Sequence, residues 1–275
     1  MRERLPRIGL HVILIAASLA MVAPFVWQII TSLKSLSSAT AVPPVLLPEG
    51  RWANYGRVFD LLPFGTQFLN TLLTALLRTA GQVLFCSMAA YAFARLRFWG
   101  RDGMFLVYLS ALMVPGIVMT IPNFILVKEA GLLNTFLGIM APTLLMTPFA
   151  VFFLRQFFLS INKELEEAAF LDGAGKVRTF VQIILPMSQT ALATLALSTF
   201  IAGWNDYLWP LLVGKNPEVR LLNVAMGIFR SQTPQGVPDW GGLMAGALIS
   251  IVPLLVLFAL FGKRIVNSIS FSGFR

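Results

Sequence analysis

The feature that most constrains this chain is the recurrence of apolar segments of about 20 residues along its 275-residue length. A helix of about 20 apolar residues is long enough to cross the hydrocarbon core of a bilayer. Only 12% of the residues are charged, whereas soluble domains have about 25%, and the mean hydropathy is +0.78. The sequence therefore predicts an all-α integral membrane protein.

We expect six transmembrane helices. The first apolar run follows basic residues, as in a signal peptide, but its length and the lack of a small-residue cleavage site predict a retained span. Pro115 and Pro122 interrupt the third run, which is tolerated where neighbouring helices or a water-lined path satisfy the freed backbone groups. The six predicted spans cover residues 8–30, 66–94, 103–127, 135–158, 187–213 and 240–262.

The distribution of basic residues predicts the orientation. With a cytoplasmic amino terminus, roughly twice as many Lys and Arg residues lie inside as outside, as the positive-inside rule requires. Both termini are then cytoplasmic. We expect an amino-terminal span with an external loop (1–65), a core (66–262) with a cytoplasmic loop at 158–186, and a cytoplasmic tail (263–275).

The cytoplasmic loop is predicted to form two short helices. Ser160 or Asn162 can cap the first helix, and Gly173 or Gly175 can end it in the left-handed conformation. The second helix has one apolar stripe at helical spacing, and Pro186 marks the entry to the next span. Without further information, this pattern also fits an ordinary interfacial amphipathic hairpin. The stripe consists of Val177, Phe180, Val181 and Ile184.

Several function classes are excluded by what the sequence lacks. It contains no G-x-x-x-x-G-K-[ST] phosphate-binding pattern and no His, Cys or carboxylate cluster with metal-ligand spacing. A Ser–His–Asp site would have to use the only histidine, His11, at a membrane edge. The net charge of +9 is spread between apolar spans, so it does not indicate nucleic-acid binding. We expect no catalytic residues, no metal site and no cofactor in this chain.

A few polar residues inside the spans are candidates for a translocation path. Arg78 is the residue most costly to place in a membrane, so it is either functional or part of a structural pair. Trp204, Asn205 and Asp206 combine an aromatic face with amide and carboxylate groups, which suits a sugar, although Trp is also a usual interface anchor. We add Asn70 and Asn123 to this set. Asp206 is also the only candidate for the coupling carboxylate of an ion-driven secondary transporter, the alternative class.

The cytoplasmic loop also resembles a known motif. Glu167-Ala168-Ala169, Gly173, Ile183 and Leu185-Pro186 have the spacing of the EAA loop of type I ATP-binding-cassette (ABC) importer permeases. The resemblance implies that this loop docks into a cytoplasmic ATPase. Alanines allow close approach, and a glutamate can form a charge-assisted contact with a basic partner residue. The expected coupling residues are Glu166, Glu167, Ala168, Ala169, Asp172 and Gly173.

The resemblance extends over nearly the whole chain. The segments 89–95 (AAYAFAR), 204–213 (WNDYLWPLLV) and 239–258 are similar to the second permease of maltose-type carbohydrate importers. This implies the type I permease fold with six spans. It also implies a bacterial or archaeal cytoplasmic membrane, a second homologous permease, two cytoplasmic ATPase subunits that hold ATP and Mg, and an external solute-binding protein that delivers a sugar. The loop 214–239 would contact the binding protein, and the tail 271–275 would reach toward the ATPase.

Arg78 departs from this family pattern, because relatives usually carry a small or polar residue there. An anionic substrate, such as a glycerophospho-compound, is therefore the alternative to a neutral sugar.

Overall fold

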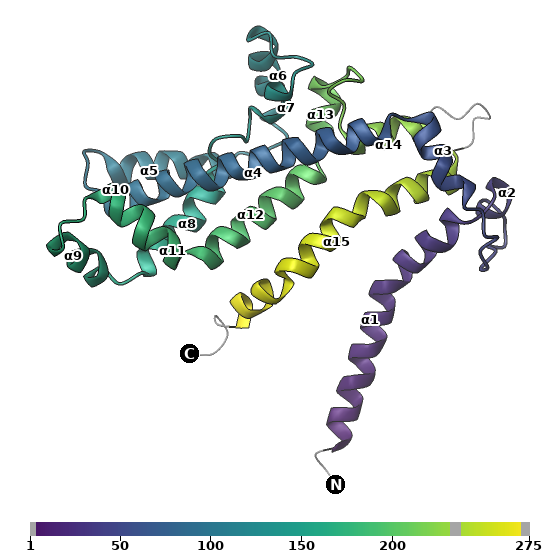
Figure 1. Cartoon of the computed structure of the whole chain (residues 1–275), viewed down its shortest axis with the longest axis horizontal. Helices are drawn as coiled ribbons and strands as arrows, with labels where there is room; N and C mark the ends of the chain where they lie inside the picture. The colour runs from purple at the N-terminus through teal and green to yellow at the C-terminus, as the bar shows by residue number, and fades with distance from the viewer. Residues whose placement is uncertain (1–3, 232–237, 271–275) are drawn as a thin grey trace. The chain divides into compact units, whose positions relative to one another are not determined.

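The computed structural model describes the backbone of residues 4–231 and 238–270, and the side chains of residues 9–228 and 238–260 (Figure 1). The described residues form helices, turns and loops, without a β-strand. They divide into two compact units. One combines the described parts of 1–65 and 225–253, and the other those of 66–224 and 254–275.

The first unit is built around the amino-terminal helix and the loop that follows it. The buried side chain of Asn54 joins the two, since its Nδ2 donates to the carbonyls of Ser32 and Lys34, each at 2.8 Å. Arg57 forms an ion pair of 2.9 Å with Asp239 at the start of the last helix. The unit contains α1 (Arg4–Ser32), α2 (Leu36–Ala39), α3 (Ala53–Leu61) and the beginning of α15 (Trp240–Ser270).

The second unit is organised along α4 (Phe64–Arg95). Figure 1 shows α12 running beside α4, and the helices α5, α8, α9 and α10 gathered where α4 ends. The other elements are α5 (Arg101–Ser110), η1 (Ala111–Met113), α6 (Thr120–Glu129), α7 (Phe136–Met140), α8 (Pro148–Ser160), α9 (Glu164–Leu171), α10 (Lys176–Thr179), η2 (Phe180–Ile184), α11 (Leu185–Met187), α12 (Gln189–Trp204) and α13 (Leu208–Val213). The helix α14 (Leu222–Ser231) begins in this unit, and its residues from Ala225 onward belong to the first unit.

Within the described residues, three helices are long and apolar enough to cross a membrane by themselves: Gly9–Ser32, Phe64–Arg95 and Trp240–Leu260. A fourth span results if Lys176–Met187 and Gln189–Trp204, which meet at 77°, are counted together. The predicted third and fourth spans are each divided into shorter helices. In the third, the break falls at Pro115, whereas Pro122 lies in the first turn of α6, where a missing N–H is tolerated.

The break in the fourth predicted span is supported by α4. Gln82 donates through Nε2 to the carbonyl of Thr143 at 2.7 Å, and the Cys86 thiol lies 3.8 Å from the carbonyl of Leu145. A Cβ at Gly81 would lie 2.3 Å from the carbonyl oxygen of Leu144, so only glycine permits this approach. The polar groups of α4 therefore satisfy backbone that the helices leave open, as a membrane requires.

The core of the second unit lies around the end of α4, between α5, α8 and the start of α12. Large side chains interdigitate there, and a buried side chain of this size contributes about 1.5–3 kcal/mol in a soluble core. The cluster includes Tyr91, Phe105, Leu154, Phe158, Ile184 and Leu195.

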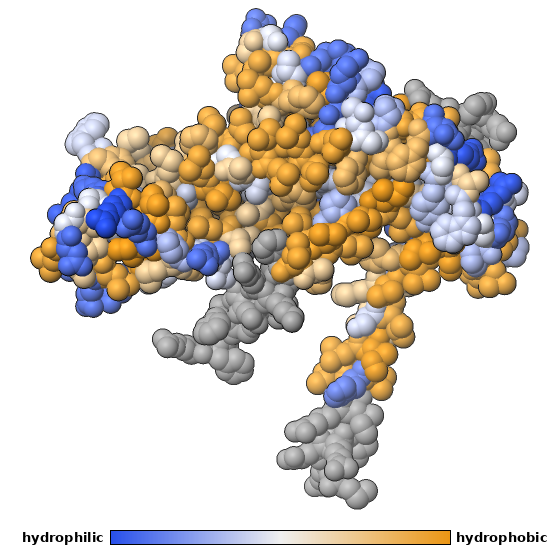
Figure 2. Space-filling view, viewed as in Figure 1, coloured by the Kyte–Doolittle hydropathy of each residue, from blue (hydrophilic) through white to orange (hydrophobic). Residues whose placement is uncertain are grey.

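Much of the remaining apolar surface is exposed, as expected for helices that face lipid. None of the apolar window of α1 and only 11% of that of α15 is buried. Figure 2 shows apolar residues over much of the visible surface of the second unit, with polar residues gathered at the end that carries α9 and around α6 and α13. This pattern is the reverse of a soluble protein, whose exposed apolar patches are small.

The last helix continues beyond the predicted span. Its apolar segment, Trp240–Leu260, agrees with the predicted span 240–262, and the helical backbone of α15 continues through the first residues of the predicted tail to Ser270. The residues that follow, 263–270, contain no proline or glycine, so nothing in their sequence ends the helix. The predicted tail contact at 271–275 lies outside the described residues, as does part of the predicted external loop, 232–237.

Candidate functional site

The α9–α10 hairpin, residues 162–187, has the predicted helix–turn–helix form. Asn162 accepts through Oδ1 from the backbone N–H of Glu164 at 3.1 Å, which satisfies one free donor at the helix start. The first turn of α9 is acidic, which suits the helix dipole. Gly173 has φ +81°, so it is the glycine that ends α9 in the left-handed conformation, whereas Gly175 does not adopt it.

The second helix of the hairpin differs from the predicted regular helix. Its residues Phe180–Ile184 form a π-helix, which takes more residues per turn than an α-helix. The predicted stripe therefore does not face one way: Ile184 is fully buried, but Val177 is 78% exposed and Val181 is 52% exposed.

The predicted coupling residues occupy both sides of α9. The side chains of Glu167, Ala168 and Asp172 and the backbone of Gly173 are exposed, and Ala169 is half-buried. Glu166 is instead buried. The hairpin thus offers an open acidic and small-residue surface and holds one carboxylate inside.

The partner of Glu166 is Arg95, the last residue of α4. Arg95 Nε and Glu166 Oε1 lie 2.7 Å apart, and the side chains are 4% and 12% exposed. Arg95 Nη2 also donates to the carbonyls of Phe158 and Ile161, at 2.7 Å and 2.6 Å. Burial raises the pKa of Glu166 above its ordinary value, although the guanidinium of Arg95 acts in the opposite direction. The sequence does not predict this pairing, although Arg95 is part of the family-like segment 89–95.

Tyr91 makes a second contact between α4 and the hairpin. Its hydroxyl donates to the carbonyl of Lys176, the first residue of α10, at 3.3 Å. Its ring packs on that of Phe180, with centroids 5.0 Å apart. Tyr91 lies four residues before Arg95, so both side chains are on one face of α4.

The predicted path residues Arg78 and Asp206 form a buried ion pair. Arg78 Nη1 donates to Asp206 Oδ2 at 2.9 Å, and the two side chains are 9% and 22% exposed. The pair joins the middle of α4 to the residues after α12. Arg78 was expected to be either functional or part of a structural pair. The structure supplies a partner for such a pair, Asp206, within the chain itself.

The other predicted path residues have structural contacts or lie apart. Asn70 donates to the carbonyls of Glu218 and Arg220 at 2.8 Å and 3.2 Å. Asn205 is exposed and donates through Nδ2 back to Ile201 at 3.0 Å. Asn123 lies on α6.

Trp204 is only 2% exposed. Its ring packs against those of Phe68 and Phe200, with centroids 5.4 Å and 5.8 Å away. In this structure the Trp204 ring is therefore enclosed by its neighbours.

A second polar centre on α4 was not predicted. Gln82 accepts through Oε1 from the hydroxyls of Thr147 and Thr199, at 3.3 Å and 3.4 Å, in addition to its bond to the broken span. Glutamine at one position carries no periodic signal, so the sequence did not mark it.

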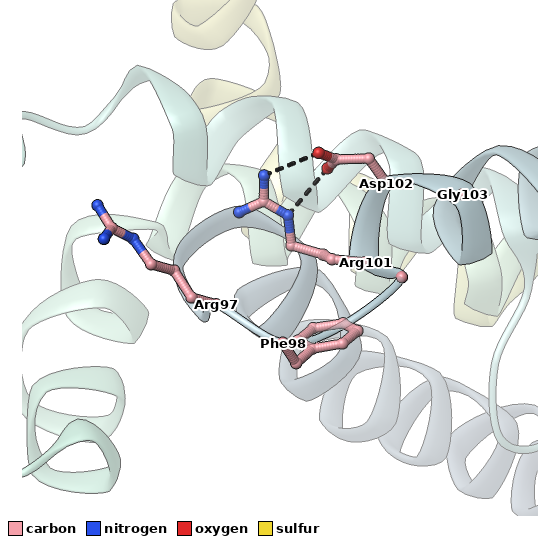
Figure 3. Close-up of a pocket in the computed structure, with 6 residues that line it drawn as sticks. Arg97, Phe98, Arg101, Asp102 and Gly103 are labelled. Atoms are coloured by element: carbon pink, nitrogen blue, oxygen red, sulfur yellow. Dashed lines mark hydrogen bonds and ion pairs between the residues drawn. The ribbon is translucent and has the colours of Figure 1, made fainter.

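A pocket of about 480 Å³ lies at the turn between α4 and α5 (Figure 3). Arg101 pairs with Asp102 at 2.9 Å, and this bond lowers the pKa of the Asp102 carboxyl. Figure 3 shows Arg97 pointing away from the pair. Of the two arginines that line the pocket, Arg101 is therefore neutralised by an ion pair with Asp102. Among the residues that the structure describes, no group of His, Cys, Asp and Glu could hold a metal.

Comparisons with known proteins place these features in a family. Residues 82–270 match the family described as "Binding-protein-dependent transport system inner membrane component". The chain is 32% identical to the diacetylchitobiose uptake system permease protein NgcG of Streptomyces coelicolor, over 96% of this chain and 88% of that protein. It is 33% identical to the trehalose/maltose transport system permease protein MalG of Thermococcus litoralis, over 98% of each.

Two further comparisons extend the set. The chain is 31% identical to the sn-glycerol-3-phosphate transport system permease protein UgpE of Yersinia pestis, over 94% of each. A chain of a crystal structure of a bacterial ABC transporter that imports the acidic polysaccharide alginate matches with a TM-score of 0.84 at 24% identity, over 96% of this chain and 97% of that one. This likeness shows the fold. The chain therefore belongs to the family of binding-protein-dependent transport system inner membrane components, the non-catalytic permease subunits of ABC importers, in which the ATPase is a separate chain.

Proposed function

We propose that this chain is a permease subunit that takes up a sugar or sugar derivative by alternating access, driven by a partner ATPase. The observation that carries the proposal is the exposed surface of α9, made of Glu167, Ala168 and Asp172, on a short helix that ends at Gly173. Small residues permit a close approach, and the carboxylates can bind a basic cleft. ATP binding closes the ATPase subunits, which moves α9, and the spans follow as rigid bodies.

The proposed topology has six spans with both termini in the cytoplasm. Three single helices and one bent pair are long and apolar enough to supply four of these spans. In the proposed topology the shorter helices between Arg101 and Ser160 supply the other two, and α9 lies on the cytoplasmic side with both termini. The protein resides in the cytoplasmic membrane of a bacterium or archaeon. Its partners are a second homologous permease, two ATPase subunits that bind ATP and Mg, and an external solute-binding protein.

A sugar is favoured over an anionic solute because the buried charge on α4 is already matched. Arg78 pairs with Asp206, so the pair presents no net positive charge to a phosphate. Two relatives are named for diacetylchitobiose and for trehalose and maltose, and one for sn-glycerol-3-phosphate. We therefore expect a neutral or weakly charged oligosaccharide.

The test is uptake by proteoliposomes that contain this chain with its co-purified partners, enclosed ATP and the external binding protein. Labelled disaccharides and glycerol-3-phosphate are offered in parallel. The proposal predicts ATP-dependent uptake of a sugar, and uptake of glycerol-3-phosphate alone would assign the anionic alternative.

The coupling surface is tested separately with Glu167→Lys. The matched control is Glu164→Lys, which changes an exposed carboxylate in the same turn of α9. We expect Glu167→Lys to weaken ATPase docking or to separate ATP hydrolysis from uptake, and the control to do much less. Normal substrate-stimulated hydrolysis and uptake in Glu167→Lys would contradict the coupling role.

A further inference from the structure

The end of α4 contacts the α9–α10 hairpin at both of its helices. Arg95 reaches the start of α9 through Glu166, and Tyr91 reaches the start of α10 through the carbonyl of Lys176. We propose that Arg95 is a positioning residue that transmits movement of the hairpin to α4, with Tyr91 as a second attachment. This inference rests on the proposed coupling role of α9.

Arg95 is suited to this role because it holds three parts of the chain at once. Its Nη2 donates to the carbonyls of Phe158 and Ile161, which lie at the end of α8 and in the turn before α9. Its Nε lies 2.7 Å from the Glu166 carboxylate, on α9 itself. The guanidinium of Arg95 is rigid and planar, so a displacement of α9 is resisted by the two hydrogen bonds of Nη2 and by the ion pair with Glu166 together.

The structure also shows where such a movement would be delivered. Arg78 lies 17 positions before Arg95 on the same helix, which is about 26 Å at a rise of about 1.5 Å per residue. Between them, Gln82 binds the broken span at Thr143 and the next helix at Thr199. A shift of the end of α4 therefore acts directly on the Arg78–Asp206 pair and on the broken span, because a helix is a stiff element with buried contacts along its length.

Glu166 provides a variant that removes one contact with little change of shape. Glu166→Gln keeps the size of the side chain but removes its charge. Because burial already disfavours the Glu166 carboxylate, a neutral side chain at this position is tolerated by the fold. A loss of coupling in this variant then reflects the lost ion pair. The matched control is Glu164→Gln, an exposed carboxylate on the same turn.

The experiment compares ATP hydrolysis and substrate uptake in the reconstituted complex for Glu166→Gln, Arg95→Gln, the double variant, Arg95→Lys and the control. We expect both single variants to keep the ATPase bound and to consume about tenfold more ATP per substrate, within the range of typical coupling energies. The double variant should be no worse than Arg95→Gln, because the two residues act through one contact. Arg95→Lys should restore part of the loss, since it keeps a donor and the charge.

Two results would overturn the inference. One is an unchanged ATP-to-substrate ratio in Arg95→Gln with the complex intact. The other is a double variant whose loss of coupling equals the product of the losses in Arg95→Gln and Glu166→Gln, which would show that the two residues act independently. A failure of the proposed function is distinguishable from both, because the unmodified complex would then bind no ATPase or show no ATP-dependent uptake.

Discussion

Breaking the Arg78–Asp206 pair should destabilise the second unit by an amount that its geometry predicts. At 2.9 Å and an effective dielectric constant of about 20, the attraction between the two charges is about 6 kcal/mol. Desolvation offsets much of this, but removal of one partner leaves the other charge buried, which costs about 3–5 kcal/mol. Because the Asp206 side chain is 22% exposed, we expect the lower end, about 3 kcal/mol.

The perturbation is a cycle of Arg78→Ala, Asp206→Ala and the double variant. Each single variant should lower the unfolding temperature by roughly 6–12 °C, from about 2–4 °C per kcal/mol in a chain of this size class. The double variant should lower the unfolding temperature by much less than the sum of the two single losses, because it leaves no unpaired charge.

The assay is thermal unfolding of the purified complex in detergent, followed by tryptophan fluorescence. Arg97→Ala, which removes an exposed arginine, is the control and should change the temperature little. Additive effects of the two single variants would refute the reasoning, as would an Arg78→Ala variant as stable as the control. Uptake by the same variants then shows whether the pair also serves the translocation path.

Three further predictions follow from the same structure. Gly173→Ala places a side chain at φ +81°, which costs about 1–2 kcal/mol locally, so this variant should reduce uptake per ATP hydrolysed. The control Gly175→Ala, at φ −74°, should not reduce it. Equal effects of the two variants would show that the left-handed turn has no role in coupling. Gly81→Ala should lower the yield of folded complex, because its Cβ would lie 2.3 Å from the Leu144 carbonyl, whereas Gly65→Ala meets open space and should be neutral or stabilising. Burial raises the folded-state pKa of Glu166 above its ordinary 4.5, so its contribution to stability is full below that pH and is lost as the pH rises through the raised pKa. The unfolding temperature of the unmodified complex should therefore fall relative to that of Glu166→Gln as the pH rises above 4.5, and an opposite slope would show a lowered pKa.

The sequence predicted three of the six expected spans as single long helices, and it predicted that the cytoplasmic loop forms a two-helix hairpin. Apolar length alone identifies α1, α4 and α15, because no shorter pattern reaches across a bilayer. The glycine at 173 was predictable as a helix end because few other residues adopt a positive φ at low cost. The π-helix at Phe180–Ile184 could not be predicted, because it leaves the residue types of the apolar stripe unchanged and alters only their register along the helix.

The pairing of the site residues could not be read from the sequence. Arg78 and Asp206 were each marked because charge is costly in a span, but nothing in their spacing links them. Glu166 was expected to be a coupling residue and Arg95 was part of the family-like segment 89–95, but nothing in their spacing predicted that the two side chains pair. Trp204 was marked for its aromatic face, yet two phenylalanines from α4 and α12 enclose it, which only the tertiary packing reveals.

The most direct test of the central claim is uptake by sealed proteoliposomes under two energy sources. One set encloses ATP and has its ion gradients collapsed, and the other has a proton or sodium gradient and no ATP. The account predicts that sugar uptake requires ATP, the partner ATPase and the external binding protein, and survives the loss of ion gradients. Uptake by this chain alone, driven by an ion gradient without ATP, would contradict it.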